Sequence, residues 1–171
     1  FYKNKEDIFR VLLLLIMKQG TVLMDKYFAD ESPAFKYAAI NIVGIKAAES
    51  NEFVRESYYE CYTSNIVFEQ MVEYITDVSE RMLRYKTPDY IHEDYYIRTL
   101  LIRGAMRSCI AKFYFRQSIP SKKCAETLTR MSLSQFGFDE LEIKNVLMRI
   151  EKLDKSLSDI AHRLIRESIN I

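Results

Sequence analysis

The chain has 171 residues, a length that predicts one domain large enough to bury a core. It contains only four glycines and three prolines, which argues against β-sandwiches, barrels and glycine-rich phosphate loops. Lysine and arginine number 25 and aspartate and glutamate 24, so the formal net charge of +1 indicates neither nucleic acid nor a membrane surface as a partner. Because the first residue is Phe1 and not Met, we expect the chain to be part of a longer protein.

Helix-breaking residues are few and divide the chain into long periodic segments. Ser32 and Pro33 form a cap followed by a proline at the first helical position, and Gly137 is a C-terminal cap glycine. Asp139 and Glu142 form a capping box at the start of the last segment. The segments are 4–28, 33–49, 52–63, 65–86, 93–117, 120–137 and 139–171. The sequence therefore predicts an all-α fold, a bundle of about seven helices in one continuous domain.

The last predicted helix carries an apolar pattern with a period of seven residues. Leucine, isoleucine and valine fill both apolar positions of the heptad over three repeats. Such a seam favours contact between two copies of the chain, and packing inside the chain's own bundle is the alternative for the same spacing. The predicted dimer contacts are Ile143, Val146, Ile150, Leu153, Leu157, Ile160 and Leu164.

Two arginines, Arg103 and Arg107, lie in the middle of the segment 93–117 and share a face with aromatic and aliphatic residues. Burying a lone charge costs several kcal/mol, so each guanidinium needs a partner. Acidic residues on another helix, acidic residues across a dimer interface, or an anionic ligand could supply it. The candidate acids on another helix are Glu69, Glu73 and Asp77.

The chain also holds 12 tyrosines, 10 phenylalanines and 7 methionines. Aromatic and methionine side chains on inward helix faces suit an adaptable apolar pocket, and plain core filling is the alternative. A lone asparagine in an apolar stretch of the second helix is a polar residue that such a pocket can use. The predicted ligand contacts are Asn41, Phe68, Met71, Tyr74, Tyr96, Leu100, Arg103 and Arg107.

Cysteine usage and hydropathy bear on the compartment. Cys61, Cys109 and Cys124 are odd in number and far apart, so we expect no disulfide framework and a reducing, cytoplasmic location. The apolar run from Val11 to Met17 has seven residues and is too short for a bilayer, which needs about 20. We therefore expect no membrane partner.

Few residues of the sequence have the type and spacing that a catalytic or metal site requires. The pairs Asp89/His92 and Asp159/His162 have the spacing of metal ligands, yet both use the shorter acid, and a surface histidine is the better interpretation of each. No cysteine lies near a histidine, and no serine has a nearby histidine and a glycine elbow. We expect no enzymatic activity, no metal and no cofactor.

The opening nonapeptide Phe1-Tyr2-Lys3-Asn4-Lys5-Glu6-Asp7-Ile8-Phe9 resembles a junction found in the tetracycline-repressor (TetR) family of transcriptional regulators. In that family a tyrosine-rich tail of the DNA-recognition helix runs through an aromatic-Lys-Asn-Lys-Glu-acid stretch into the fourth helix. Tyr2 stands where the family usually has Phe. Beyond residue 9 the resemblance is architectural: seven helices correspond to the family's fourth to tenth, and the last can pair in a dimeric four-helix bundle.

The resemblance implies two parts, residues 1–9 as the end of a helix-turn-helix domain with its junction, and residues 10–171 as the effector-binding and dimerisation domain. It implies that Lys5 contacts DNA phosphate and that Phe1 lies near the DNA backbone, although solvated charge is the alternative for Lys3 and Lys5. The function implied is a ligand-responsive regulator, with repression favoured over activation. The implied partners are a second copy of the chain, palindromic operator DNA bound through the missing head, and a small anionic or amphipathic effector.

Two rival functions come from other classes. A helical protein-interaction module would have a core filled by its own side chains and no small ligand. A bundle metalloenzyme would bind metal at His92 or His162.

Overall fold

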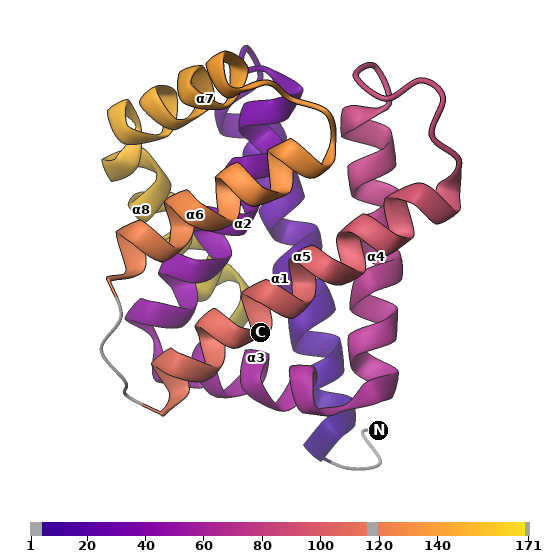
Figure 1. The fold of residues 1–171 in the computed structure, drawn as a ribbon. Coiled ribbons are helices and arrows are strands. Elements are labelled where there is room, and N and C mark those ends of the chain that lie inside the picture. The colour runs from indigo at the N-terminus through magenta and orange to yellow at the C-terminus, as the bar shows by residue number, and fades with distance from the viewer. Residues whose placement is uncertain (1–4, 116–119, 170–171) are drawn as a thin grey trace.

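The computed structural model describes residues 5–115 and 120–169, which form eight α-helices and no strand within those ranges (Figure 1). The all-α prediction is confirmed, and the predicted count of seven helices is wrong by one. The helices are α1 (Lys5–Tyr27), α2 (Pro33–Ser50), α3 (Glu52–Thr63), α4 (Asn65–Leu83), α5 (His92–Tyr114), α6 (Ser121–Gln135), α7 (Glu140–Lys152) and α8 (Asp154–Ile169).

Local capping chemistry sets several helix boundaries where the sequence predicts them. The Ser32 hydroxyl accepts a hydrogen bond from the backbone N–H of Phe35 at 3.1 Å, and proline opens α2. Asp139 and Glu142 form the predicted capping box, in which each carboxylate accepts from the other residue's backbone N–H, at 2.8 and 2.9 Å. Gly137, with φ of 76°, takes the left-handed conformation that favours glycine just after α6.

The extra helix arises because the segment predicted as one helix from residue 139 onward is broken. Leu153 has φ −104° and ψ 13° and lies between α7 and α8. A straight helix over residues 140–169 would be about 45 Å long. The break instead lets both α7 and α8 pack against α2 (Figure 1).

The predicted dimer seam lies along α7 and α8 and is used inside the chain. Its side chains are buried in the core, except that Leu153 is half-buried at the break between the helices. These residues therefore pack inside the chain's own bundle, which was the alternative to dimer contact for this spacing. The seam residues of the core are Ile143, Val146, Ile150, Leu157, Ile160 and Leu164.

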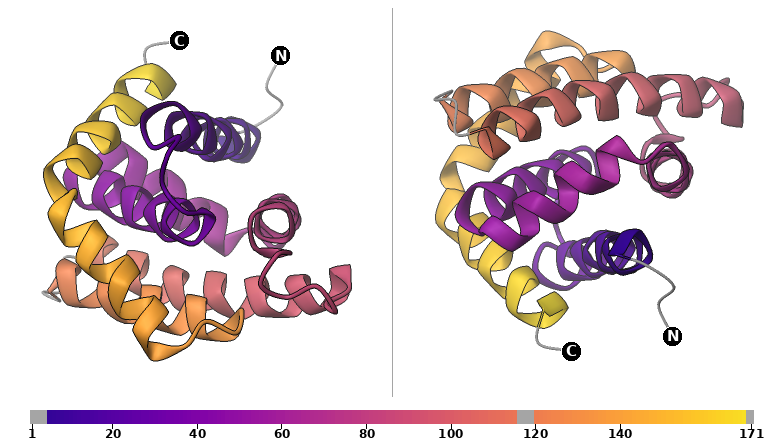
Figure 2. Two further views of the ribbon diagram at one scale, coloured as in Figure 1. Left: turned by 90° about the horizontal axis from the view of Figure 1, so that it is seen from above. Right: turned by 90° about the horizontal axis from the view of Figure 1, so that it is seen from below.

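Helix α2 is the centre of the bundle and packs against each of the other described helices. Twelve of its 18 residues are buried, and many are alanine or glycine, which allow close approach between helix backbones. Figure 2 shows α2 and α3 between α1 on one side and α5 on the opposite side. Any ligand that reaches the core between α1 and α5 therefore lies beside α2.

Helices α5 and α6 are antiparallel neighbours joined by a disulfide between Cys109 and Cys124. The expectation of no disulfide is wrong, because 15 residues separate these cysteines along the chain but the helical hairpin brings them together. The third cysteine, Cys61, is buried in the core. The cysteines therefore give no support to the expected location in a reducing compartment.

The disulfide closes a loop of 15 residues, so its reduction should lower the free energy of unfolding by about 3 kcal/mol. Urea unfolding with and without reductant measures this difference. The double variant Cys109→Ala/Cys124→Ala is the control and should unfold at the same urea concentration under both conditions. Equal midpoints for the unaltered protein with and without reductant would contradict the prediction.

Candidate functional site

The side chain of Arg103 on α5 is buried in the core, with 2% of the residue exposed. Its Nη2 donates to Oδ1 of Asn41 on α2 at 2.5 Å, and its Nη1 donates to the sulfur of Met106 at 3.1 Å. Its Nε has no hydrogen-bond partner in the part of the chain that the structure describes. A guanidinium stays charged in proteins, so this is a buried positive charge whose neighbours are neutral.

The acids predicted as partners lie elsewhere. Glu69 accepts a hydrogen bond from the Tyr96 hydroxyl at 2.5 Å, and Glu73 lies 3.8 Å from His92. Asp77 is exposed. Among the residues that the structure describes, no carboxylate forms an ion pair with Arg103, which leaves its charge uncompensated within that part of the chain.

Three buried tyrosines surround this charge, Tyr37 on α2 and Tyr58 and Tyr62 on α3. Burial raises the pKa of all three hydroxyls, and the positive charge of Arg103 opposes the rise in each. Within the described ranges, the hydroxyls of Tyr37 and Tyr62 have no hydrogen-bond partner. We call these residues the Arg103 cluster: Arg103, Asn41, Met106, Tyr37, Tyr58 and Tyr62.

A small internal cavity of about 20 Å³ adjoins the cluster. Two glycines face it. A Cβ atom added to the buried Gly20 on α1 would meet no atom within 4 Å, whereas one added to Gly44 on α2 would lie 3.1 Å from the Met106 methyl group. The free space is therefore on the α1 side. The lining residues are Ile16, Met17, Gly20, Ile40, Val43, Gly44, Tyr58, Ile75, Arg103, Met106 and Leu164.

Of the predicted ligand contacts, the structure brings Asn41 and Arg103 together at the cluster. Arg107 is exposed, so the expectation that both arginines share a buried aromatic face is wrong for Arg107. The two differ because α5 turns by about 100° per residue, which places a residue four positions along 40° further round the helix. Leu100 on the same helix is half-buried.

The other predicted contacts lie outside the lining of this cavity. Met71 is fully buried in the core, and Phe68 is half-buried with its ring 5.7 Å from that of Tyr62. Tyr74 is half-buried, with its hydroxyl 3.4 Å from the hydroxyl of Thr21. Tyr96 is half-buried, and its hydrogen bond to the Glu69 carboxylate raises its pKa to about 12.

Sequence reasoning missed the tyrosines and the two glycines of the site. Tyr58 and Tyr62 are four residues apart in one helix, a spacing that places both on the same face. Gly20 and Gly44 each interrupt a helical pattern, which costs about 1 kcal/mol relative to alanine and usually has a packing reason. These were the signals that could have identified them.

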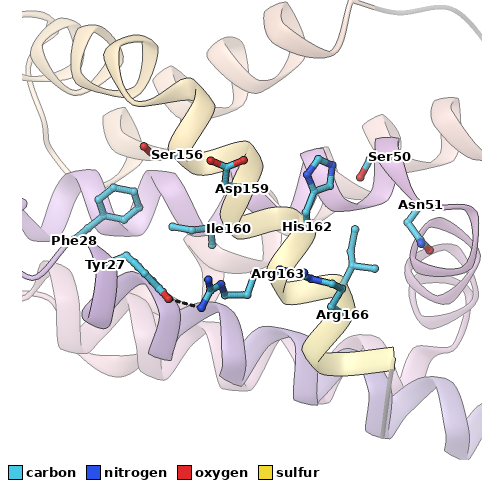
Figure 3. A pocket seen from close by; sticks show the side chains of 11 residues that line it. Tyr27, Phe28, Ser50, Asn51, Ser156, Asp159, Ile160, His162, Arg163 and Arg166 are labelled. Carbon is cyan, nitrogen blue, oxygen red and sulfur yellow. Dashed lines mark hydrogen bonds between the residues drawn. The ribbon is translucent and has the colours of Figure 1, made fainter.

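A second, larger hollow of about 870 Å³ lies at the surface between the end of α1, the α2–α3 junction and α8 (Figure 3). Arg163 reaches toward the Tyr27 hydroxyl and donates a hydrogen bond to it. Asp159 and His162 lie on the same hollow, both exposed. Its charged groups are on the exterior, and none of the buried polar atoms that lack a partner belongs to its lining. The Arg103 cluster is therefore the stronger candidate site.

The remaining predicted residues give a mixed result. Phe1 lies outside the described residues; Lys5 opens α1, and its side chain is outside them too. Helix α1 continues unbroken across the predicted domain boundary after residue 9. His92 lies 2.9 Å from a Glu80 oxygen, and this hydrogen bond raises its pKa. No cluster of metal-binding side chains occurs among the described residues.

Comparisons of the chain with protein-family models, with curated proteins and with solved structures gave no match. None of the described helices combines the length and the apolar character that crossing a membrane requires.

Replacing Arg103 by methionine keeps a long side chain and removes the charge. We expect the free energy of unfolding to stay within about 1 kcal/mol of the original or to rise, because relief from burying an uncompensated charge offsets the bond lost by Asn41. Urea unfolding monitored by circular dichroism measures it. A loss of about 3 kcal/mol or more, the usual cost of breaking a buried pair, would contradict this description of the site.

Proposed function

We propose that this chain is the effector-binding and dimerisation domain of a ligand-responsive transcriptional regulator of the tetracycline-repressor family, which releases operator DNA when a small molecule binds. One observation carries the proposal. Helix α1 begins in the segment that resembles the family's junction, and its middle, at Ile16, Met17 and Gly20, lines the cavity beside Arg103. A single helix thus connects the junction to a buried charged site.

The geometry supports a lever mechanism. Arg103 belongs to α5, and α1 and α5 lie on opposite sides of α2 and α3 (Figure 2). A ligand held by Arg103 would fill the space on the α1 side and displace α1 relative to the rest of the bundle. Release of DNA requires only that the ligand bind the displaced form more tightly than the DNA-bound form. Each tenfold difference between the ligand's affinities for the two forms corresponds to a difference in binding free energy of about 1.4 kcal/mol.

The first turns of α1 also suit contact with a further domain. Ile8 is 44% exposed, Val11 is 41% exposed and Phe53 on α3 is 42% exposed. The rings of Phe9 and Phe53 are 6.4 Å apart, which joins the two helices at this end of the bundle. A DNA-binding head packed on this end would cover these apolar side chains.

For dimerisation we propose α5 and α6 in place of the seam on α7 and α8. Ile97, Leu101 and Ala105 form a stripe at four-residue spacing along α5; Ile97 is 49% and Leu101 60% exposed. The stripe leads into a groove of about 310 Å³ between α5 and α6, lined by Ala105, Cys109, Cys124 and Met131 among others. Two helices from each of two copies would form the four-helix bundle that the resemblance implies.

The small volume of the cavity favours one rival, a protein-interaction module whose core is filled by its own side chains. A space of about 20 Å³ holds little more than one water molecule. The rival predicts that no small compound raises the melting temperature, whereas the proposed regulator predicts that its effector does.

The proposal is tested with the product of the complete gene, including whatever precedes this chain. We expect it to enrich palindromic sequences from a random DNA library and to release them when an effector is added. Lys5→Ala should weaken binding to all sequences alike and reduce the salt dependence, because a phosphate contact is lost. Lys26→Ala, near the other end of α1, is the matched control and should bind as the original does. Absence of any DNA enrichment would refute the regulator.

The dimer is tested by replacing Leu101 with glutamate. Sedimentation of the original chain should give about twice the 20.3 kDa chain mass, and Leu101→Glu should shift it toward the single mass because a charge would be buried at the interface. Ile66→Glu, at a position on α4 that is 69% exposed, is the control and should leave the mass unchanged. An equal effect of both variants would contradict this interface.

A further inference from the structure

We infer that Arg103 recognises the carboxylate group of a small organic acid with a short apolar tail, and that this acid is the effector. The inference rests on the proposed function for the role of effector, whereas the binding itself follows from the cluster. The first step is the charge. The guanidinium is buried among Asn41, Met106 and tyrosine rings, and the described part of the chain supplies no anion to it.

The second step is the set of donors left over. A guanidinium has five N–H groups, of which the hydrogen bonds to Asn41 and to the weak acceptor sulfur of Met106 use two. Among the described residues, none accepts a hydrogen bond from the Nε–H. The remaining N–H groups can hold both oxygens of one carboxylate in the paired geometry that arginine favours. Within the described ranges, the hydroxyls of Tyr37 and Tyr62 also lack hydrogen-bond partners, and they are further donors in the cluster.

The third step is the charge of the ligand. One fixed positive charge matches one negative charge, and the cavity lining contains no second cationic residue. Burial keeps the tyrosines neutral by raising their pKa values. A phosphate dianion would retain a net negative charge in an apolar surrounding, which burial disfavours. A singly charged carboxylate fits this balance.

The fourth step is the tail. Apart from Arg103 and the Tyr58 hydroxyl, the lining consists of aliphatic and methionine side chains and two glycines. Free space lies beside Gly20, where an added Cβ atom would touch nothing within 4 Å. Met17 and Met106 are unbranched and can change rotamer to admit a chain of a few carbons. A tail that enlarges this space acts on α1.

Titration calorimetry and thermal unfolding at constant ionic strength test the inference, with acetate, butanoate and hexanoate as probes and hexanamide as the uncharged match. We expect hexanoate to raise the melting temperature and to bind more tightly than acetate, and hexanamide to have no effect. Arg103→Met should weaken hexanoate binding roughly tenfold or more, since a charged hydrogen bond is lost. Arg107→Met, one turn along α5 and exposed, should bind hexanoate as the original does.

A second pair of variants tests the position of the tail. Gly20→Leu fills the space on the α1 side and should weaken hexanoate binding, whereas Gly104→Leu, at the other helical glycine with no atom within 4 Å, should not. Circular dichroism confirms that each variant is folded. Equal binding of hexanoate and hexanamide, unchanged binding by Arg103→Met, or acetate binding as tight as hexanoate would overturn the inference.

The same probes separate this inference from the proposed function. If hexanoate binds through Arg103 but the complete gene product selects no DNA, the anion site stands and the regulator fails. If the gene product selects DNA and hexanoate does not bind the chain, the regulator stands and the carboxylate site is overturned.

Discussion

A guanidinium in a protein core has to be balanced by the groups that surround it, and the interior of this bundle is arranged around one such group. Arg103 comes from α5, Asn41 from α2 and the nearby tyrosines from α2 and α3, so three helices meet at one positive charge. The Asn41 oxygen and the Met106 sulfur accept hydrogen bonds from the guanidinium but do not neutralise its charge. A core built only for stability gains little from such a group, because apolar side chains of similar volume are commonly as stabilising.

The position of α2 makes this arrangement possible. Its alanines and its single glycine let the neighbouring helices approach closely, and its polar side chains are consequently held near their neighbours. Asn41 is one of these; its amide nitrogen donates to the Tyr37 carbonyl at 3.3 Å, which orients its oxygen toward Arg103. Gly44, on the same helix, leaves the space that the Met106 methyl group and the Tyr58 hydroxyl approach. Burial of α2 thus orders both the polar and the apolar sides of the cavity.

Much of the fold follows from local signals, and the site follows from them only in part. The capping residues Ser32 and Asp139 act within three residues of their own positions, so the sequence predicts these helix starts correctly. The break at Leu153 lets α7 and α8 both pack against α2, a long-range arrangement that heptad spacing does not contain. Arg103 and Asn41 stand out as polar residues in apolar segments, yet their hydrogen bond spans 62 residues, and only the packing of α2 against α5 shows it. For the same reason the sequence does not pair Cys109 with Cys124, which meet only because α5 and α6 pack side by side.

The covalent bridge between α5 and α6 has a mechanical consequence for the cavity. Cys109 lies six residues after Arg103 on α5, so the helix that carries the charge is fastened to its neighbour within two turns of it. Helix α1, on the opposite wall, is held by side-chain packing against α2, α3 and α8. The cavity therefore lies between α5, which is covalently fastened to α6, and α1, which is held by packing alone. A ligand that enlarges the cavity would consequently displace α1 more than α5.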